Sequence, residues 1–136
     1  MSKYFFIVLL CITLCSCELI VLSSKKKNKS IELSQRTPVT TVFLFKSELD
    51  SNNIKAASEL LLQSNGAPFI AIQKYELFDD LSRLKRIIGG KPVTAFSADS
   101  LSPENYKVRM EIDYLKLMTF NTLKVNDAWF ITNYTE

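Results

Sequence analysis

Residues 106–114, Tyr-Lys-Val-Arg-Met-Glu-Ile-Asp-Tyr, decide the fold class that we expect for this chain. Apolar side chains alternate with polar or charged ones over the whole stretch, with Tyr114 as the last apolar member. This period of two is the pattern of a β-strand that has one face in a core and the other in water. It is the clearest strand in the chain.

Further strands are expected on both sides of it. A turn at Ser102–Asn105 precedes it, and a tight turn at Asn126-Asp127 precedes the last strand, but no strong turn residue marks the boundary near residues 114–117. No helix separates these segments, so we expect an antiparallel meander of three or four strands. The additional strands expected are Val93–Leu101, Leu117–Val125 and Ala128–Tyr134.

Three helices are expected before the strands. Thr37-Pro38 is a helix start, with Thr37 as N-cap and Pro38 at the first helical position, and this helix ends near Asp50. A second helix starts at Asn52 or Asn53 and stops near residue 64. The third covers Lys74–Ile88 and ends at Gly89-Gly90. The segregated order predicts an α+β fold, with Val108, Met110, Ile112, Trp129 and Ile131 buried against Phe43, Leu60, Leu77 and Leu81.

The first residues have the composition of an export signal. Lys3 is followed by an apolar run from Tyr4 to Leu14, which has the length of a signal-peptide core and is shorter than the roughly 20 residues of a typical membrane span. Leu14-Cys15-Ser16-Cys17 at its end resembles the lipobox of bacterial lipoproteins. The resemblance implies cleavage before Cys17 and acylation of that cysteine, so that a lipid-anchored chain faces the periplasm or the exterior.

A membrane anchor without cleavage is an alternative. The run from Tyr4 to Leu22 reaches spanning length, with Glu18 near its end at a cost of up to roughly 3 kcal/mol if central. The lysines that follow would then lie in the cytoplasm. A soluble secreted product is a further alternative. In the lipoprotein interpretation the lysines contact anionic lipid head groups or are simply solvated. These lysines are Lys25, Lys26, Lys27 and Lys29.

Composition excludes several kinds of chemistry. The chain has no histidine, and its three cysteines all lie within the first 17 residues. A zinc site of the usual ligands, a Ser-His-Asp triad and a Cys-His pair are therefore excluded from the body, and we expect neither a metal nor another cofactor. The lysine cluster lacks the interleaved aromatic residues of a nucleic-acid interface, so we expect no nucleic acid partner.

The order of motifs in the body resembles the nuclear-transport-factor-like superfamily, which includes ketosteroid isomerase and the polyketide cyclases. The motifs are Thr37-Pro38-Val39, the alanine-rich second helix around Ala56-Ala57, and the closing Asn126-Asp127-Ala128-Trp129-Phe130-Ile131. The resemblance implies a cone, in which a curved sheet wraps around three helices and encloses a pocket. We therefore expect a signal peptide at 1–16, a lipidated cysteine and flexible tether at 17–36, and a cone domain at 37–136.

Family enzymes use an aspartate or histidine base in the cone, but no aspartate here falls in a recognisable motif of the family. The weak catalytic candidates are Asp113 and Tyr114, although Asp113 is expected on the wet face of its strand. Two functions remain open: an envelope lipoprotein that binds a protein or small apolar ligand without catalysis, and a tethered isomerase- or cyclase-like enzyme. An inner-membrane secretion-assembly factor would require the uncleaved anchor. Other residues considered are Tyr75, Asp79, Arg83 and Tyr106.

Overall fold

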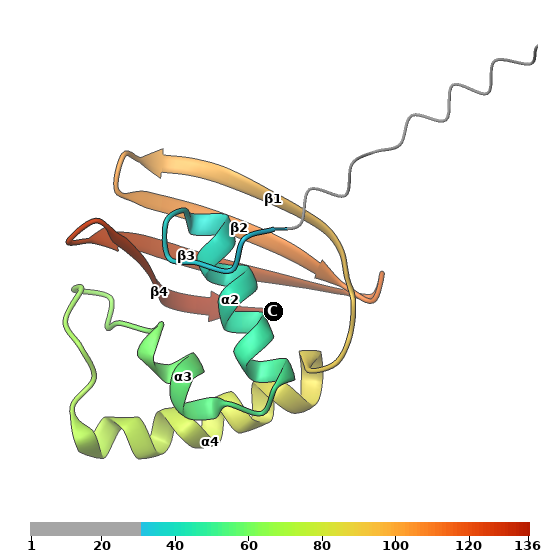
Figure 1. Ribbon diagram of the computed structural model, residues 1–136, viewed down its shortest axis with the longest axis horizontal. Coiled ribbons are helices and arrows are strands. Elements are labelled where there is room, and N and C mark those ends of the chain that lie inside the picture. The colour runs from blue at the N-terminus through green and yellow to red at the C-terminus, as the bar shows by residue number, and fades with distance from the viewer. Residues whose placement is uncertain (1–30) are drawn as a thin grey trace, which may run out of the picture. The chain divides into compact units, whose positions relative to one another are not determined.

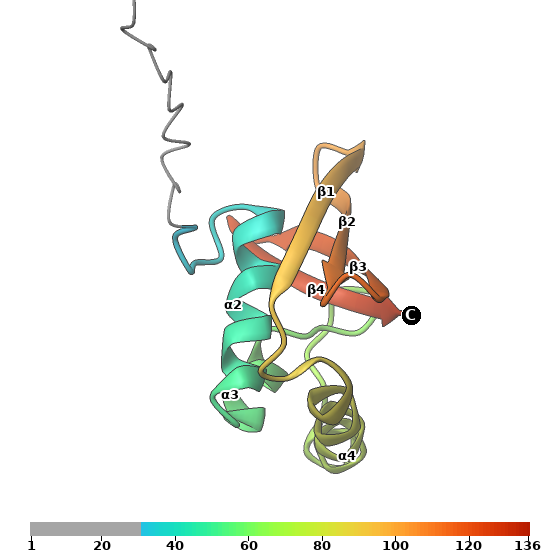
Figure 2. The same ribbon diagram turned by 90° about the vertical axis from the view of Figure 1, so that its right-hand side faces the viewer.

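A computed structural model describes residues 31–136. Three helices precede a four-stranded antiparallel sheet, so the α+β class expected from the sequence is confirmed. The helices all lie on the same side of the sheet (Figures 1 and 2). The elements are α2 (Pro38–Asp50), α3 (Ile54–Glu59), α4 (Ala71–Ile88), β1 (Val93–Ser102), β2 (Asn105–Ile112), β3 (Lys116–Val125) and β4 (Ala128–Thr135).

Helix α2 begins where the sequence predicts. The Thr37 side chain accepts a hydrogen bond from the backbone N–H of Thr40 at 3.2 Å, and the Thr40 hydroxyl accepts one from the N–H of Thr37. These bonds satisfy two backbone donors that the first turn of a helix leaves unpaired. Pro38 occupies the first turn, where its missing N–H costs nothing.

Helix α3 is shorter than predicted, because its expected second half joins the sheet. The helix ends at Glu59, and Leu61 forms a parallel bridge with Ile131 of β4. The N–H of Leu62 donates to the Ile131 carbonyl, and the N–H of Ile131 donates to the Leu60 carbonyl, both at 2.9 Å. The backbone groups that a longer helix would have used are thus paired with β4.

Helix α4 starts at Ala71, three residues before the predicted Lys74, and ends at Ile88 as expected. The N–H of Ile70 donates to the side-chain oxygen of Gln73 at 3.1 Å, which caps the earlier start. After the helix, Gly90 adopts a φ of 69°, in the left-handed region where glycine carries no steric penalty. None of the helices in residues 31–136 is both long and apolar enough for a membrane span.

The sheet is a simple meander with strand order β1-β2-β3-β4. Strand β2 ends at Ile112, so the predicted continuation to Tyr114 is wrong. The chain reverses through Asp113-Tyr114-Leu115 and pairs Ile112 with Lys116. Such a short reversal requires left-handed backbone, and Asp113 and Tyr114 have φ values of 55° and 58°. Because this tight reversal contains no glycine, no strong turn signal marks it in the sequence.

The core lies between α2 and the inner face of the sheet. Phe45 of α2 and Phe120 of β3 are fully buried and meet edge to face, with ring centroids 6.0 Å apart. All five strand residues predicted for the core are buried, as are Leu60 and Leu81, while Phe43 and Leu77 are partly buried against it. The alternating pattern of β2 therefore identified the face that packs on the helices.

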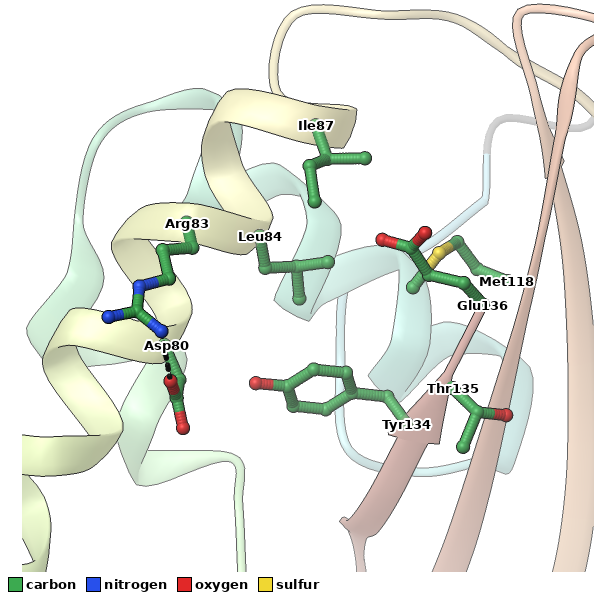
Figure 3. Close-up of a pocket in the computed structure, with 8 residues that line it drawn as sticks. All are labelled: Asp80, Arg83, Leu84, Ile87, Met118, Tyr134, Thr135 and Glu136. Carbon is green, nitrogen blue, oxygen red and sulfur yellow. Dashed lines mark ion pairs between the residues drawn. The ribbon is translucent and has the colours of Figure 1, made fainter.

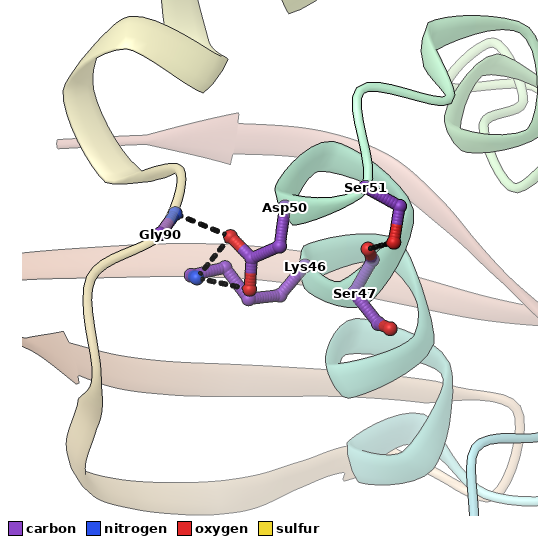
Figure 4. A network of polar contacts seen from close by, with 5 residues as sticks. All are labelled: Lys46, Ser47, Asp50, Ser51 and Gly90. Atoms are coloured by element: carbon purple, nitrogen blue, oxygen red, sulfur yellow. Dashed lines mark hydrogen bonds and ion pairs between the residues drawn. The ribbon is translucent and has the colours of Figure 1, made fainter.

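One ion pair joins a buried lysine to a partly exposed aspartate at the end of α2 (Figure 4). The Lys46 side chain is 4% exposed, and its Nζ donates to both carboxylate oxygens of Asp50, at 2.6 and 2.7 Å. Asp50 also accepts the backbone N–H of Gly90 at 2.7 Å. The carboxylate thus neutralises a buried cation and connects the end of α2 to the link between α4 and β1.

Candidate functional site

The two weak catalytic candidates lie in the turn between β2 and β3. The N–H of Asp113 donates to the Pro92 carbonyl at 2.9 Å, and the N–H of Tyr114 donates to Thr94 Oγ1 at 3.3 Å. The Tyr114 side chain is 80% exposed, which corrects its expected place on the dry face. The backbone N–H groups of both residues are therefore used in forming the turn. Neither residue is part of the wall of the two pockets described below.

The candidates on α4 are all on its surface. Tyr75 and Asp79 are exposed. Asp79 and Asp80 are both within helical reach of Arg83, and the ion pair that the structure forms is with Asp80, at 3.8 Å. Both spacings place side chains next to each other on a helix, so the sequence could not choose between them. Tyr106 is half-buried on β2 and packs edge to face on Trp129, with ring centroids 5.3 Å apart.

A recess lies between α4 and the ends of the last two strands, and sequence analysis did not predict it. Its volume is about 270 Å³. Figure 3 shows the Tyr134 hydroxyl directed toward the side formed by Asp80 and Arg83. The wall includes the apolar side chains of Leu84, Ile87 and Met118 and the polar residues Asp80, Arg83, Tyr134, Thr135 and Glu136.

Charge in the recess is confined to its rim. Arg83 and Asp80 are largely exposed, and Glu136 is held by an ion pair with Lys116 at 2.5 Å. Burial raises the pKa of the Tyr134 hydroxyl, and the negative charge of Asp80 raises it further. Tyr134 is therefore protonated at neutral pH, and its hydroxyl can donate a hydrogen bond. The recess can hold a small apolar molecule that has one hydrogen-bonding end.

A second surface feature is the apolar start of α4. Ile70, Ile72 and Tyr75 are 60%, 70% and 73% exposed. A shallow hollow of about 210 Å³ lies beside them, with Ala71, Lys74 and Phe78 in its wall. Large apolar side chains grouped on a surface are typical of contact sites.

The interior between helices and sheet holds no acidic group in the part of the chain that the structure describes. Each carboxylate of residues 31–136 belongs to a residue that is at least partly exposed. The fully enclosed side chains are mainly apolar, and Lys46 is the one ionisable residue of this range in the buried class. No cluster of three or more acidic residues within the same range is placed to hold a metal ion.

The predicted lipidation site and the lysine cluster lie outside the described residues. This applies to Cys17 and to Lys25, Lys26, Lys27 and Lys29. Gln35, within the segment predicted as tether, is bonded to the sheet: its carbonyl accepts the N–H of Trp129 and its side chain donates to the Trp129 carbonyl, both at 2.9 Å.

No model of a known protein family matches this chain, and no curated protein matches it.

The recess residues could not have been found from the sequence. Asp80 and Arg83 carried only the signal of a solvated helix face, and Tyr134 only that of a closing strand. Met118 and Tyr134 come within reach of α4 through the pairing of β3 with β4. The recess residues of α4 are more than 30 residues away from Met118 in the sequence, so no local pattern connects them.

Proposed function

We propose that this chain is a membrane-anchored lipoprotein of the bacterial cell envelope, with a body that binds a small apolar ligand or a partner without catalysing a reaction. The anchor is proposed from the sequence Leu14-Cys15-Ser16-Cys17 at the end of an apolar run. Acylated Cys17 would hold the chain at the bilayer. The lysines at 25–29 would add contacts with anionic head groups, at about 1 kcal/mol each near a charged surface.

We further propose that the body is a nuclear-transport-factor-like cone. Three observations support this: the helices cover one face of an antiparallel meander, the segment after α3 extends the sheet by a parallel bridge from Leu61 to Ile131, and the core lies between α2 and the sheet. A fold of this kind hosts both enzymes and binding proteins, so the function has to be argued from the site.

The observation that carries the non-catalytic interpretation is the filled interior. A cone enzyme needs a general base inside the cavity, held close to the substrate. Here the interior of residues 31–136 is filled by apolar side chains, and every carboxylate in that range is in contact with water. The chain also has no histidine. A space that a ligand could enter is instead the surface recess beside Tyr134, which has apolar walls and donors at its rim.

Mass spectrometry of the mature N-terminus tests the anchor. We expect an acylated N-terminal Cys17 in the wild type and in Cys15→Ser, because the middle position of the motif is permissive. In Cys17→Ser the acyl chains should be absent and the precursor should accumulate. An unmodified N-terminus at Met1 or Ser2 in the wild type would show that the anchor is uncleaved and would refute lipidation.

Binding in the recess is tested by a titration of residues 31–136 with cyclohexanol, a neutral apolar ring with one hydroxyl, followed by NMR. We expect shifts of the Leu84, Ile87 and Tyr134 amides, and weaker binding in Tyr134→Phe, which keeps the ring and removes the hydroxyl. Ile72→Ser, at the apolar start of α4, is the matched control and should bind as the wild type does. Shifts confined to the start of α4, or no shifts, would contradict the proposed ligand site.

A further inference from the structure

The two edges of the sheet differ in how their backbone is used. The β4 edge is covered by the chain itself, since Ile131 is bonded to Leu60 and Leu62 and Trp129 is bonded to Gln35. Strand β1 forms the other edge and pairs only with β2. Within residues 31–136, no backbone hydrogen bond outside that pairing involves β1. Its outward N–H and C=O groups are thus open to a further strand.

The composition of β1 does not protect this edge. Natural sheets usually block an open edge with lysines, proline or an irregularity in the strand. Strand β1 has register irregularities near both ends, but Ala95–Ser100 pairs regularly with β2 and lies in an exposed stretch. Its one charged residue, Asp99, is neutralised by Arg109 of β2 at 2.9 Å. The regular stretch therefore presents no free charge that would repel an added strand.

Phe96 supplies apolar surface at the same edge. Its ring meets Phe43 of α2 edge to face, with centroids 5.1 Å apart, yet the side chain remains 50% exposed. Ala98, two residues further on the same face of the strand, is small and also exposed. A strand added beside β1 would cover Phe96 if it placed a small apolar residue opposite.

From these observations we infer that β1 is a self-association edge, at which a second copy of this chain adds its own β1 antiparallel to the first. A two-fold axis perpendicular to the sheet pairs identical strands in antiparallel orientation and keeps each face aligned. An axis through Ser97 sets Ser97 against its own equivalent, Phe96 against Ala98 of the second copy, and Asp99 against its Ala95. The Asp99 carboxylates of the two copies are then not opposite each other.

Two alternative registers, with the axis further along the strand, give poorer pairs. An axis through Ala98 would place Phe96 opposite the polar Ser100 of the second copy, and an axis through Asp99 would oppose two carboxylates, which destabilises a strand pair. The axis through Ser97 pairs apolar with apolar on the inner face. The contact joins two four-stranded sheets into one continuous sheet. The inference does not depend on the ligand site proposed above.

Cross-linking of the full chain in membranes tests the inference and its register together. The native cysteines all lie in the first 17 residues, so the unmodified chain is the background control. Directly opposed residues have Cα atoms about 4.5–5.5 Å apart, within the range of a disulfide. Ser97→Cys should therefore form a covalent dimer on mild oxidation.

Two other exposed serines provide matched controls. Ser100 lies three residues from the axis, so its two copies would be about 20 Å apart at roughly 3.3 Å per residue, and Ser100→Cys should not cross-link to itself. Ser64→Cys, in the loop after α3, reports random collision. Equal yields from all three variants, or cross-links of Ser97→Cys only to proteins of other sizes, would overturn the inference.

A charge placed on the axis gives an independent measurement. Ser97→Glu puts two like charges directly opposite each other in the dimer, whereas in the single copy position 97 faces the opposite charge of Arg109 on β2. Analytical ultracentrifugation of the full chain in detergent should show dimers for the wild type and for Ser64→Glu, and a several-fold lower dimer fraction for Ser97→Glu. A wild-type chain that sediments as a monomer, or a Ser97→Glu variant that dimerises as the wild type does, would refute the inference.

Discussion

Replacing Asp50 by alanine should destabilise the fold far more than its position near the surface suggests. The Asp50 side chain is 37% exposed, but its partner Lys46 is only 4% exposed and donates to both oxygens of the carboxylate. Asp50→Ala leaves that cation buried without a counter-charge. It also removes the acceptor of the Gly90 N–H, although water can replace it because Gly90 is exposed.

The expected loss is about 3 kcal/mol. Removal of one partner of a buried ion pair costs about 3–5 kcal/mol, and the low end applies because Asp50 is reached by water. For a domain of this size the loss corresponds to a fall in Tm of roughly 15 °C, at about 4–8 °C per kcal/mol. Lys46→Met removes the cation and keeps an apolar stem of similar length, so it should cost less than about 1 kcal/mol.

Urea unfolding of residues 31–136 measures these losses, with the fluorescence of Trp129 as the signal because it is the one tryptophan and is buried. In the Lys46→Met background, Asp50→Ala should cost only the Gly90 bond, about 1 kcal/mol, which gives a coupling energy of about 2 kcal/mol. A cost for Asp50→Ala below about 1 kcal/mol, or the same cost in both backgrounds, would refute the reasoning.

Three further predictions follow from single residues. Phe120→Ala should lower the free energy of unfolding by about 3–5 kcal/mol in urea denaturation, because the ring is fully buried against Phe45, while Phe130→Ala on the other face of the sheet should cost clearly less. Tyr114→Gly should raise the free energy of unfolding by about 0.5–1 kcal/mol, since glycine relieves a left-handed backbone at an exposed side chain, and a loss of stability would contradict this. The pKa of Tyr134 is raised in the folded state, so the folded protein holds this proton more tightly than the unfolded chain does. The stability that this proton contributes is complete below about pH 10 and is lost as the pH rises through the folded-state pKa. The free energy of unfolding should therefore fall less steeply from about pH 9 to 11 in Tyr134→Phe than in the wild type, and parallel pH profiles would count against the raised pKa.

Local patterns in the sequence were sufficient for most of the elements. Thr37-Pro38 marks the start of α2, Gly89-Gly90 the end of α4, and the alternation in 106–112 the strand β2, because caps, breakers and periodicity act within a few residues. The same alternation assigned Val108, Met110 and Ile112 to the core. Cleavage before Cys17 and its acylation remain predictions of the sequence.

Features that depend on distant residues needed the tertiary structure. The predicted end of α3 was wrong because Leu61 pairs with Ile131, and no pattern near Leu61 encodes a bond to a strand 70 residues later. The turn at Asp113-Tyr114 was missed because its left-handed backbone is imposed by the pairing of β2 with β3 rather than by glycine.

The features of the candidate site also separate into those visible in the sequence and those set by the tertiary structure. The absence of histidine from the sequence already limited the possible chemistry, since composition does not depend on folding. The recess at Tyr134, the counter-ion of buried Lys46 and the open edge at β1 were decided by the tertiary structure alone. Each depends on which side chains and backbone groups become neighbours or lose water when helices and strands pack, and burial is a property of the assembled fold rather than of any one segment.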